Sequence, residues 1–138
     1  MIKPWLAESL REAGLAWAPA NGDRFVVPGR DLDDRVFVIS DMVIETLRLP
    51  RGDQVLAFHG TTEWALDNLE ASEAVWLPRE DQLRDALGEA FMSLELIPGA
   101  TSGFAVTLLI GDSEQRFVDV DAEAAYARAV LALLASSA

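Results

Sequence analysis

Apolar residues recur at helical spacing near both ends of the chain. In residues 3–15, Leu10 follows Trp5 by five positions and Leu6 by four, which is helical spacing, and Gly14 is a typical helix stop. Residues 121–135 carry a second helical pattern, with Ala125, Ala129 and Leu133 along one seam behind the N-cap candidate Asp121. We therefore expect a helix at each end.

The first half between these helices alternates as strands do. Apolar runs at 24–29, 35–40 and 42–49 predict three strands, and Pro-Arg-Gly-Asp at 50–53 predicts a hairpin turn into a fourth strand at 55–59. Residues 61–70 predict a short helix capped by a threonine, and 73–78 predict another strand.

The second half has a regular order of elements. A helix is predicted at 78–90, strands at 91–98, 103–110 and 114–120, and the final helix at 121–135. Glycine-containing joints between the strands favour hairpins. We expect one α+β domain over 1–138, with antiparallel sheets, N- and C-terminal helices packed on them, and an α-β-β-β-α C-terminal half. The possible sub-halves are 1–77 and 78–138.

Charge narrows the classes of partner. The chain of 138 residues has a net charge of −12, divided equally between the two sub-halves. Both halves should repel phosphate backbones and anionic lipid, so we expect no nucleic-acid or membrane partner. Solubility explains the negative charge most simply, and a protein partner with a basic surface is the alternative explanation. No cysteine is present, no apolar run approaches a membrane span, and the N-terminus lacks signal-peptide character, so we expect a cytoplasmic protein.

Two short motifs are candidates for chemistry. His59, the only histidine, precedes Gly60 and Thr61, in the order that opens the nicotinamide-binding strand of ADP-ribosyltransferases. The simpler interpretation is a strand end that turns at the glycine, with a degenerate ADP-ribosyltransferase or NAD-binding enzyme using His59 and Thr61 as the alternative.

The second motif is acidic. Asp31, Asp33 and Asp34 could offer oxygen ligands to a hard cation, but the run lacks the glycine and closing glutamate of a calcium loop. We interpret it as a solvated turn and expect no metal and no cofactor.

No complete catalytic set is present. A phosphate-binding loop, a nucleophile elbow and a second histidine are all missing from the sequence. We therefore expect a non-enzymatic protein-interaction or adaptor domain. Trp17 and Trp76 border prolines at element ends, where a half-exposed indole could anchor a partner, although core packing is the simpler interpretation.

The last helix suggests self-association. Alanine and leucine wrap more of its circumference than a single sheet-facing stripe requires. We expect the surplus around Val130 and Leu134 to meet a partner, with a homodimer as one possibility. The alternative is that alanine is present only as a good helix former and stays solvated.

Four segments carry a resemblance that covers most of the chain. They are 21–45, 60–67, 76–88 and 121–134. They resemble a family of small acidic proteins from high-GC bacteria, often labelled pilus assembly protein CpaE. The resemblance implies a role associated with pili or secretion, and implies no catalytic residues.

Overall fold

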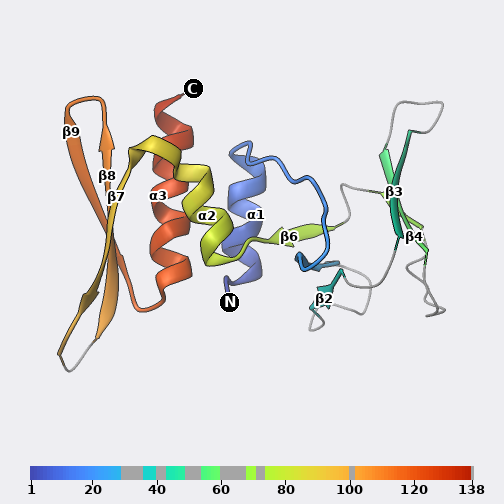
Figure 1. Cartoon of the computed structure of the whole chain (residues 1–138), viewed down its shortest axis with the longest axis horizontal. Coiled ribbons are helices and arrows are strands. Elements are labelled where there is room, and N and C mark those ends of the chain that lie inside the picture. Colours follow the sequence, from blue (N-terminus) through green and yellow to red (C-terminus); the bar gives the residue numbers. More distant parts are fainter. Residues whose placement is uncertain are drawn as a thin grey trace. The chain divides into compact units, whose positions relative to one another are not determined.

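The structure is a computed structural model that describes residues 1–28, 36–39, 43–48, 54–59, 68–70, 74–99 and 102–137. Three of these segments, 43–48, 54–59 and 68–70, are described by their backbone alone. The chain divides into two compact units. Unit 1 comprises Met1–Ala16 and Pro78–Ala138, and unit 2 comprises Trp17–Leu77. Helices and antiparallel sheets together make an α+β protein, as the sequence predicts (Figure 1).

Unit 1 contains the helices that the structure describes. These are α1 (Pro4–Glu12), α2 (Glu80–Leu87), the short 3-10 helix η2 (Gly88–Ala90) and α3 (Ala122–Ser136). Its strands β7 (Phe91–Ile97), β8 (Gly103–Ile110) and β9 (Ser113–Asp119) form one antiparallel sheet in the order β7-β8-β9. The predicted α-β-β-β-α order of the C-terminal half is confirmed.

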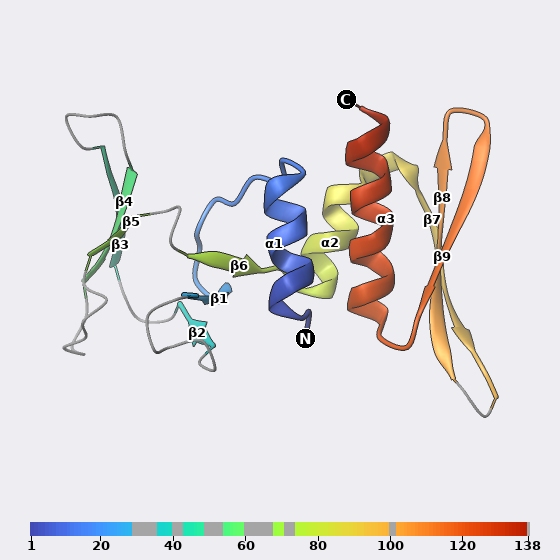
Figure 2. The same ribbon diagram turned by 180° about the vertical axis from the view of Figure 1, so that it is seen from behind.

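Helix α3 lies between the sheet and the other two helices. It contacts β8 and β9 on one side and α1 and α2 on the other, an arrangement that Figure 2 shows from behind. Its apolar circumference is explained by this position, because a helix packed on two sides needs more than one apolar stripe. The three helices, the sheet and the N-terminal residues before α1 all contribute buried side chains to the core of unit 1. These include Ile2, Leu6, Leu10, Leu83, Leu87, Val106, Leu108, Ala125, Ala129 and Val130.

Local chemistry sets the ends of these elements. Pro4 is in the first turn of α1. Backbone N–H groups there have no intrahelical acceptor, so the N–H that proline lacks costs the helix no hydrogen bond. The backbone N–H of Arg79 donates to Oε1 of Gln82 at 2.9 Å, which satisfies a donor at the start of α2. Asp121 occupies the predicted N-cap position of α3, but its side chain makes no capping hydrogen bond.

Unit 2 consists of two small antiparallel sheets. Strands β1 (Arg24–Val26), β2 (Phe37–Val38) and β6 (Val75–Leu77) form the sheet β2-β1-β6. Strands β3 (Val43–Arg48), β4 (Gln54–His59) and β5 (Asn68–Glu70) form the sheet β3-β4-β5. The predicted hairpin of β3 and β4 is confirmed, with Val43 opposite His59 and Leu47 opposite Val55.

One predicted element of unit 2 is wrong. Residues 61–70 were expected to form a helix, but Asn68–Glu70 is strand β5, paired antiparallel with β4 through Leu69 and Leu56. Pairing with a neighbouring strand outweighs the weak helical spacing of so short a segment. The rest of that segment lies outside the described residues.

The described helices are not long and apolar enough to cross a membrane.

Candidate functional site

The face of the β7-β8-β9 sheet that points away from α3 carries the strongest candidate surface. Directly opposite residues of neighbouring strands share a face, and successive residues along a strand point to opposite faces. The register places Ser93 and Arg116 on either side of Thr107, and Glu95 and Val118 on either side of Ala105. In both ribbon views α3 covers one face of this sheet, and no other described element of unit 1 lies on the opposite face. We call this uncovered side the open face.

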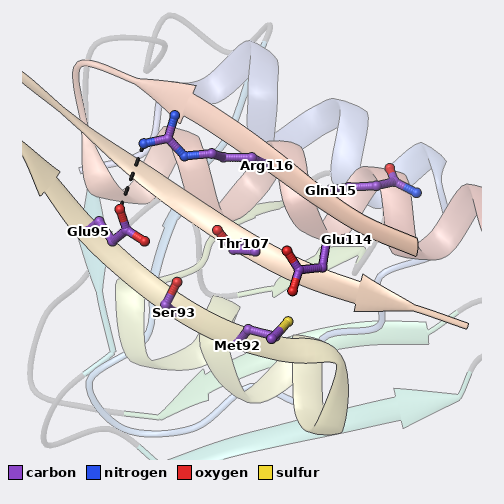
Figure 3. Close-up of a pocket in the computed structure, with 7 residues that line it drawn as sticks. All are labelled: Met92, Ser93, Glu95, Thr107, Glu114, Gln115 and Arg116. Atoms are coloured by element: carbon purple, nitrogen blue, oxygen red, sulfur yellow. Dashed lines mark ion pairs between the residues drawn. The ribbon is translucent and has the colours of Figure 1, made fainter. Parts of the chain in front are cut away.

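A charged pair crosses the middle strand of the open face. Nη2 of Arg116 on β9 lies 3.8 Å from Oε2 of Glu95 on β7, and Thr107 of β8 stands between the two strands that carry them (Figure 3). Both side chains are more than half exposed, so this pair contributes little to stability. The pair therefore leaves both groups accessible to a partner.

A shallow depression lies around this pair. It has a volume of about 440 Å³ and is lined by seven residues, Met92, Ser93, Glu95, Thr107, Glu114, Gln115 and Arg116. Figure 3 shows their side chains on all three strands. A shallow, polar-lined hollow of this kind suits a side chain of a protein partner better than an enclosed small molecule.

Large apolar side chains are exposed beside the depression. Leu109 on β8 is 41% exposed, Val118 on β9 is 50% exposed and Met92 on β7 is 48% exposed. Isolated exposed apolar residues are common, but neighbouring ones on one face mark a surface that a partner can cover. The open face therefore combines apolar contact area with charged groups.

The charge around this surface is negative. Unit 1 contains six basic and twelve acidic side chains, which leaves a net charge of −6. Glu114, which lines the depression, makes no ion pair with the described residues, since Arg116 pairs with Glu95. A cation brought to the open face would therefore find a carboxylate that no arginine of the described residues neutralises.

The two tryptophans that the sequence singled out meet in unit 2. The rings of Trp17 and Trp76 are stacked, with centroids 6.2 Å apart and an interplanar angle of 6°. Oδ2 of the buried Asp23 accepts hydrogen bonds from the indole N–H of Trp17 at 2.9 Å and from the backbone N–H of Ala20 at 3.1 Å. Both indoles are half-buried, and they pack on each other rather than standing apart as separate anchors.

The aromatic cluster continues along β1. Phe25 lies 5.9 Å from Trp17 and 5.4 Å from Phe37, measured between ring centroids. Within the described part of the chain, the buried indole N–H of Trp76 has no hydrogen-bond partner. The cluster thus has the composition of a small aromatic core around one buried carboxylate.

The surplus apolar surface of α3 was predicted around Val130 and Leu134, and the structure does not expose it at Val130. Val130 is 1% exposed and belongs to the core, because α1 and α2 cover the side of α3 that the sheet does not. The expectation that Val130 meets a partner is corrected by this packing. Leu134 is half-buried near the end of the helix.

The remaining candidates have little structural context. His59 ends β4, opposite Val43 in the ladder, so the first residue of the His-Gly-Thr motif stands at a strand end. Thr61 lies outside the described residues, as do Asp31, Asp33 and Asp34. The search of the described residues found no group of three or more histidine, cysteine or carboxylate side chains placed to hold a metal ion.

The single tyrosine lies within unit 1 rather than at the open face. Tyr126 of α3 is buried, with its ring 5.9 Å from that of Phe91. Burial raises the pKa of its hydroxyl above the usual 10.0, and the negative charge of Glu80 adds to this effect while Arg84 opposes it.

Sequence reasoning missed the residues of the open face. The signal was present in the alternation of charged and apolar residues at 113–119, where Glu114, Arg116 and Val118 share one face. Such alternation predicts a half-buried strand, but it does not say whether the polar face stays uncovered. Comparisons of the chain with models of protein families, with curated proteins and with solved structures found no match.

Proposed function

We propose that this protein is an interaction domain that binds a segment of a partner protein across the open face of the β7-β8-β9 sheet. The segment carries both apolar and basic side chains. The observation that carries this proposal is the exposure of Leu109 and Val118 on the same face as Glu114, a carboxylate without an ion pair among the described residues.

The apolar part of the surface supplies the affinity. Covering the exposed side chains of Met92, Leu109 and Val118 removes apolar area from water, which is the main favourable term in protein association. The depression around Thr107 offers a place for one protruding side chain to insert. A few well-placed anchors of this kind dominate most interfaces.

The charged groups of the open face determine which partners it favours. A net charge of −6 on unit 1 attracts cations over a distance of about a Debye length and repels acidic segments. A lysine or arginine next to Glu114 gains an ion pair without competing for Arg116, which already faces Glu95. A basic, amphipathic segment therefore complements the open face in both respects.

This proposal keeps the protein in the non-enzymatic class expected from its sequence. The resemblance to the pilus-labelled family adds the expectation that the partner belongs to a pilus or secretion system. The proposed binding depends on the open face alone, and it requires neither the non-enzymatic class nor a pilus partner.

The proposal is tested with a displayed library of short peptides of graded charge and apolar content. We expect the full chain to retain peptides enriched in both basic and apolar residues. Val118→Glu should abolish this retention because it places a charge in the apolar part of the open face.

The matched control is Val38→Glu. Val38 is 53% exposed, nearly the same fraction as Val118, and it also lies in a short strand, but it belongs to unit 2. Retention should be unchanged in this variant. Peptide binding that survives Val118→Glu, or that both variants lose equally, would refute the open face as the binding surface.

A further inference from the structure

Strand β9 forms a regular, open edge of the sheet in unit 1. The order β7-β8-β9 leaves β8 in the middle, and among the described residues no strand pairs with the outer side of β9. Its seven residues, Ser113–Asp119, pair with β8 without a register shift. The opposite edge differs, because β7 has a register shift between Phe91 and Ser93. Irregularities of that kind protect an edge from pairing, so β9 is the better template.

The hairpin between β8 and β9 determines which backbone groups face outward. The two turn residues Gly111 and Asp112 close on the pair Ile110 and Ser113. In a two-residue hairpin this closing pair is hydrogen-bonded, and hydrogen-bonded pairs then alternate along the ladder. Glu114, Arg116 and Val118 consequently direct their backbone N–H and C=O groups away from β8.

The side chains of the same three residues make the edge self-complementary. Two copies of β9 can pair antiparallel about a two-fold axis perpendicular to the sheet, and opposite residues then share a face. With the axis at Gln115, Glu114 of each copy lies opposite Arg116 of the other. With the axis at Arg116, two arginines face each other, and with the axis at Phe117, Glu114 faces Val120.

We infer that two copies of this chain associate through the outer edges of β9, with the two-fold axis at Gln115. The register is selected by charge, since it alone among these three places two pairs of opposite charge side by side and no like charges directly opposite. Each Glu114–Arg116 pair also exchanges two backbone hydrogen bonds, because both residues face outward. The interface differs from the face of α3, which the core of unit 1 already occupies.

The pairing has a direct geometric result. The two sheets become one antiparallel sheet of six strands, and the perpendicular axis keeps both open faces on the same side. Arg116 then lies between Glu95 of its own chain and Glu114 of the second copy, so the arginine bridges two carboxylates. A basic side chain of a bound segment would share Glu114 with Arg116 of the second copy; apart from this carboxylate, the inference does not depend on what the open face binds.

Charge reversal at two positions tests this register. Sedimentation equilibrium of the full chain over the micromolar range should show a dimer. Glu114→Arg places two arginines opposite each other at both ends of the pairing, and Arg116→Glu places two glutamates there. We expect each single variant to raise the dimer dissociation constant by at least roughly tenfold.

Two further samples separate a lost interface from a damaged fold. An equimolar mixture of the two single variants should associate, because position 114 of one then again faces an opposite charge at position 116 of the other. The double variant Glu114→Arg, Arg116→Glu should also recover the dimer. Far-UV circular dichroism should be unchanged throughout, since Glu114 and Arg116 are both exposed.

Glu89→Arg is the control for the change in net charge. Glu89 is exposed in η2, away from the edge of β9, and its reversal should leave the dimer intact. A wild-type chain that stays monomeric overturns the inference. Single variants that dimerise as tightly as the wild type, or a mixture that fails to associate, overturn it as well. A dimer lost equally in the Glu89 variant shows that net charge rather than register controls association, and also refutes the proposed pairing.

Discussion

Shortening Val130 to alanine tests whether this side chain of α3 lies in the core of unit 1. Val130 is 1% exposed, on a helix that contacts β8, β9, α1 and α2. The change removes two buried methyl groups, each with a transfer free energy of about 0.8 kcal/mol, and leaves a cavity that adds to the cost. We expect the free energy of unfolding to fall by about 2 kcal/mol. If Val130 instead faced solvent, the same change would cost almost nothing.

The measurement is urea-induced unfolding followed by far-UV circular dichroism. The helices that the structure describes all belong to unit 1, so the helical signal reports on the unit that contains Val130. Val120→Ala is the matched control, because Val120 is 68% exposed and should change stability by less than about 0.5 kcal/mol. Equal effects of the two substitutions would show that Val130 does not lie in the core of unit 1.

Three further outcomes are expected. The tyrosinate absorbance of Tyr126 should titrate above pH 10.0, because burial favours the neutral hydroxyl. The unfolded chain then ionises first, so stability that is complete below about pH 10 should decline as the pH rises through the raised pKa, and Tyr126→Phe should remove that part of the decline. Gly103→Ala should destabilise unit 1 by about 1–3 kcal/mol in the same urea assay, because its Cβ would lie 2.7 Å from the backbone carbonyl oxygen of Asp119. Calorimetric titration with NAD should show no saturable binding, and a binding isotherm that His59→Ala abolishes would contradict the non-enzymatic interpretation.

The elements of the C-terminal half could be predicted from the sequence because their patterns are strong and locally consistent. Alternation defines β8 and β9, and the glycine at Gly111 adopts the positive φ of 61° that suits a tight hairpin turn. The helix at α3 follows from its unbroken helix-forming composition. These signals involve only neighbours in the sequence.

Long-range packing could not be predicted in the same way. The spacing of Leu6 and Leu10 shows that α1 has one apolar face, but not that this face packs with α3 at the far end of the chain. For the same reason, the sequence pattern of α3 predicts that its surplus apolar surface meets a partner, and it wrongly predicts that Val130 lies at the surface. The strand at Leu69 was missed because its pairing with Leu56 is a tertiary preference that overrides local spacing.

Unit 1 is built from two segments that are far apart in the sequence, and this affects how it folds during synthesis. Helix α1 leaves the ribosome well before the residues that cover it, because Met1–Ala16 belongs with Pro78–Ala138. The backbone N–H of Ile2 finally donates to Oε2 of Glu123 at 3.0 Å, across 121 positions of sequence. Until α3 has emerged, the apolar side of α1 is exposed to other nascent chains, and closure must wait for this long loop. Synthesis, rather than the finished fold, is therefore the stage at which α1 is most exposed to aggregation.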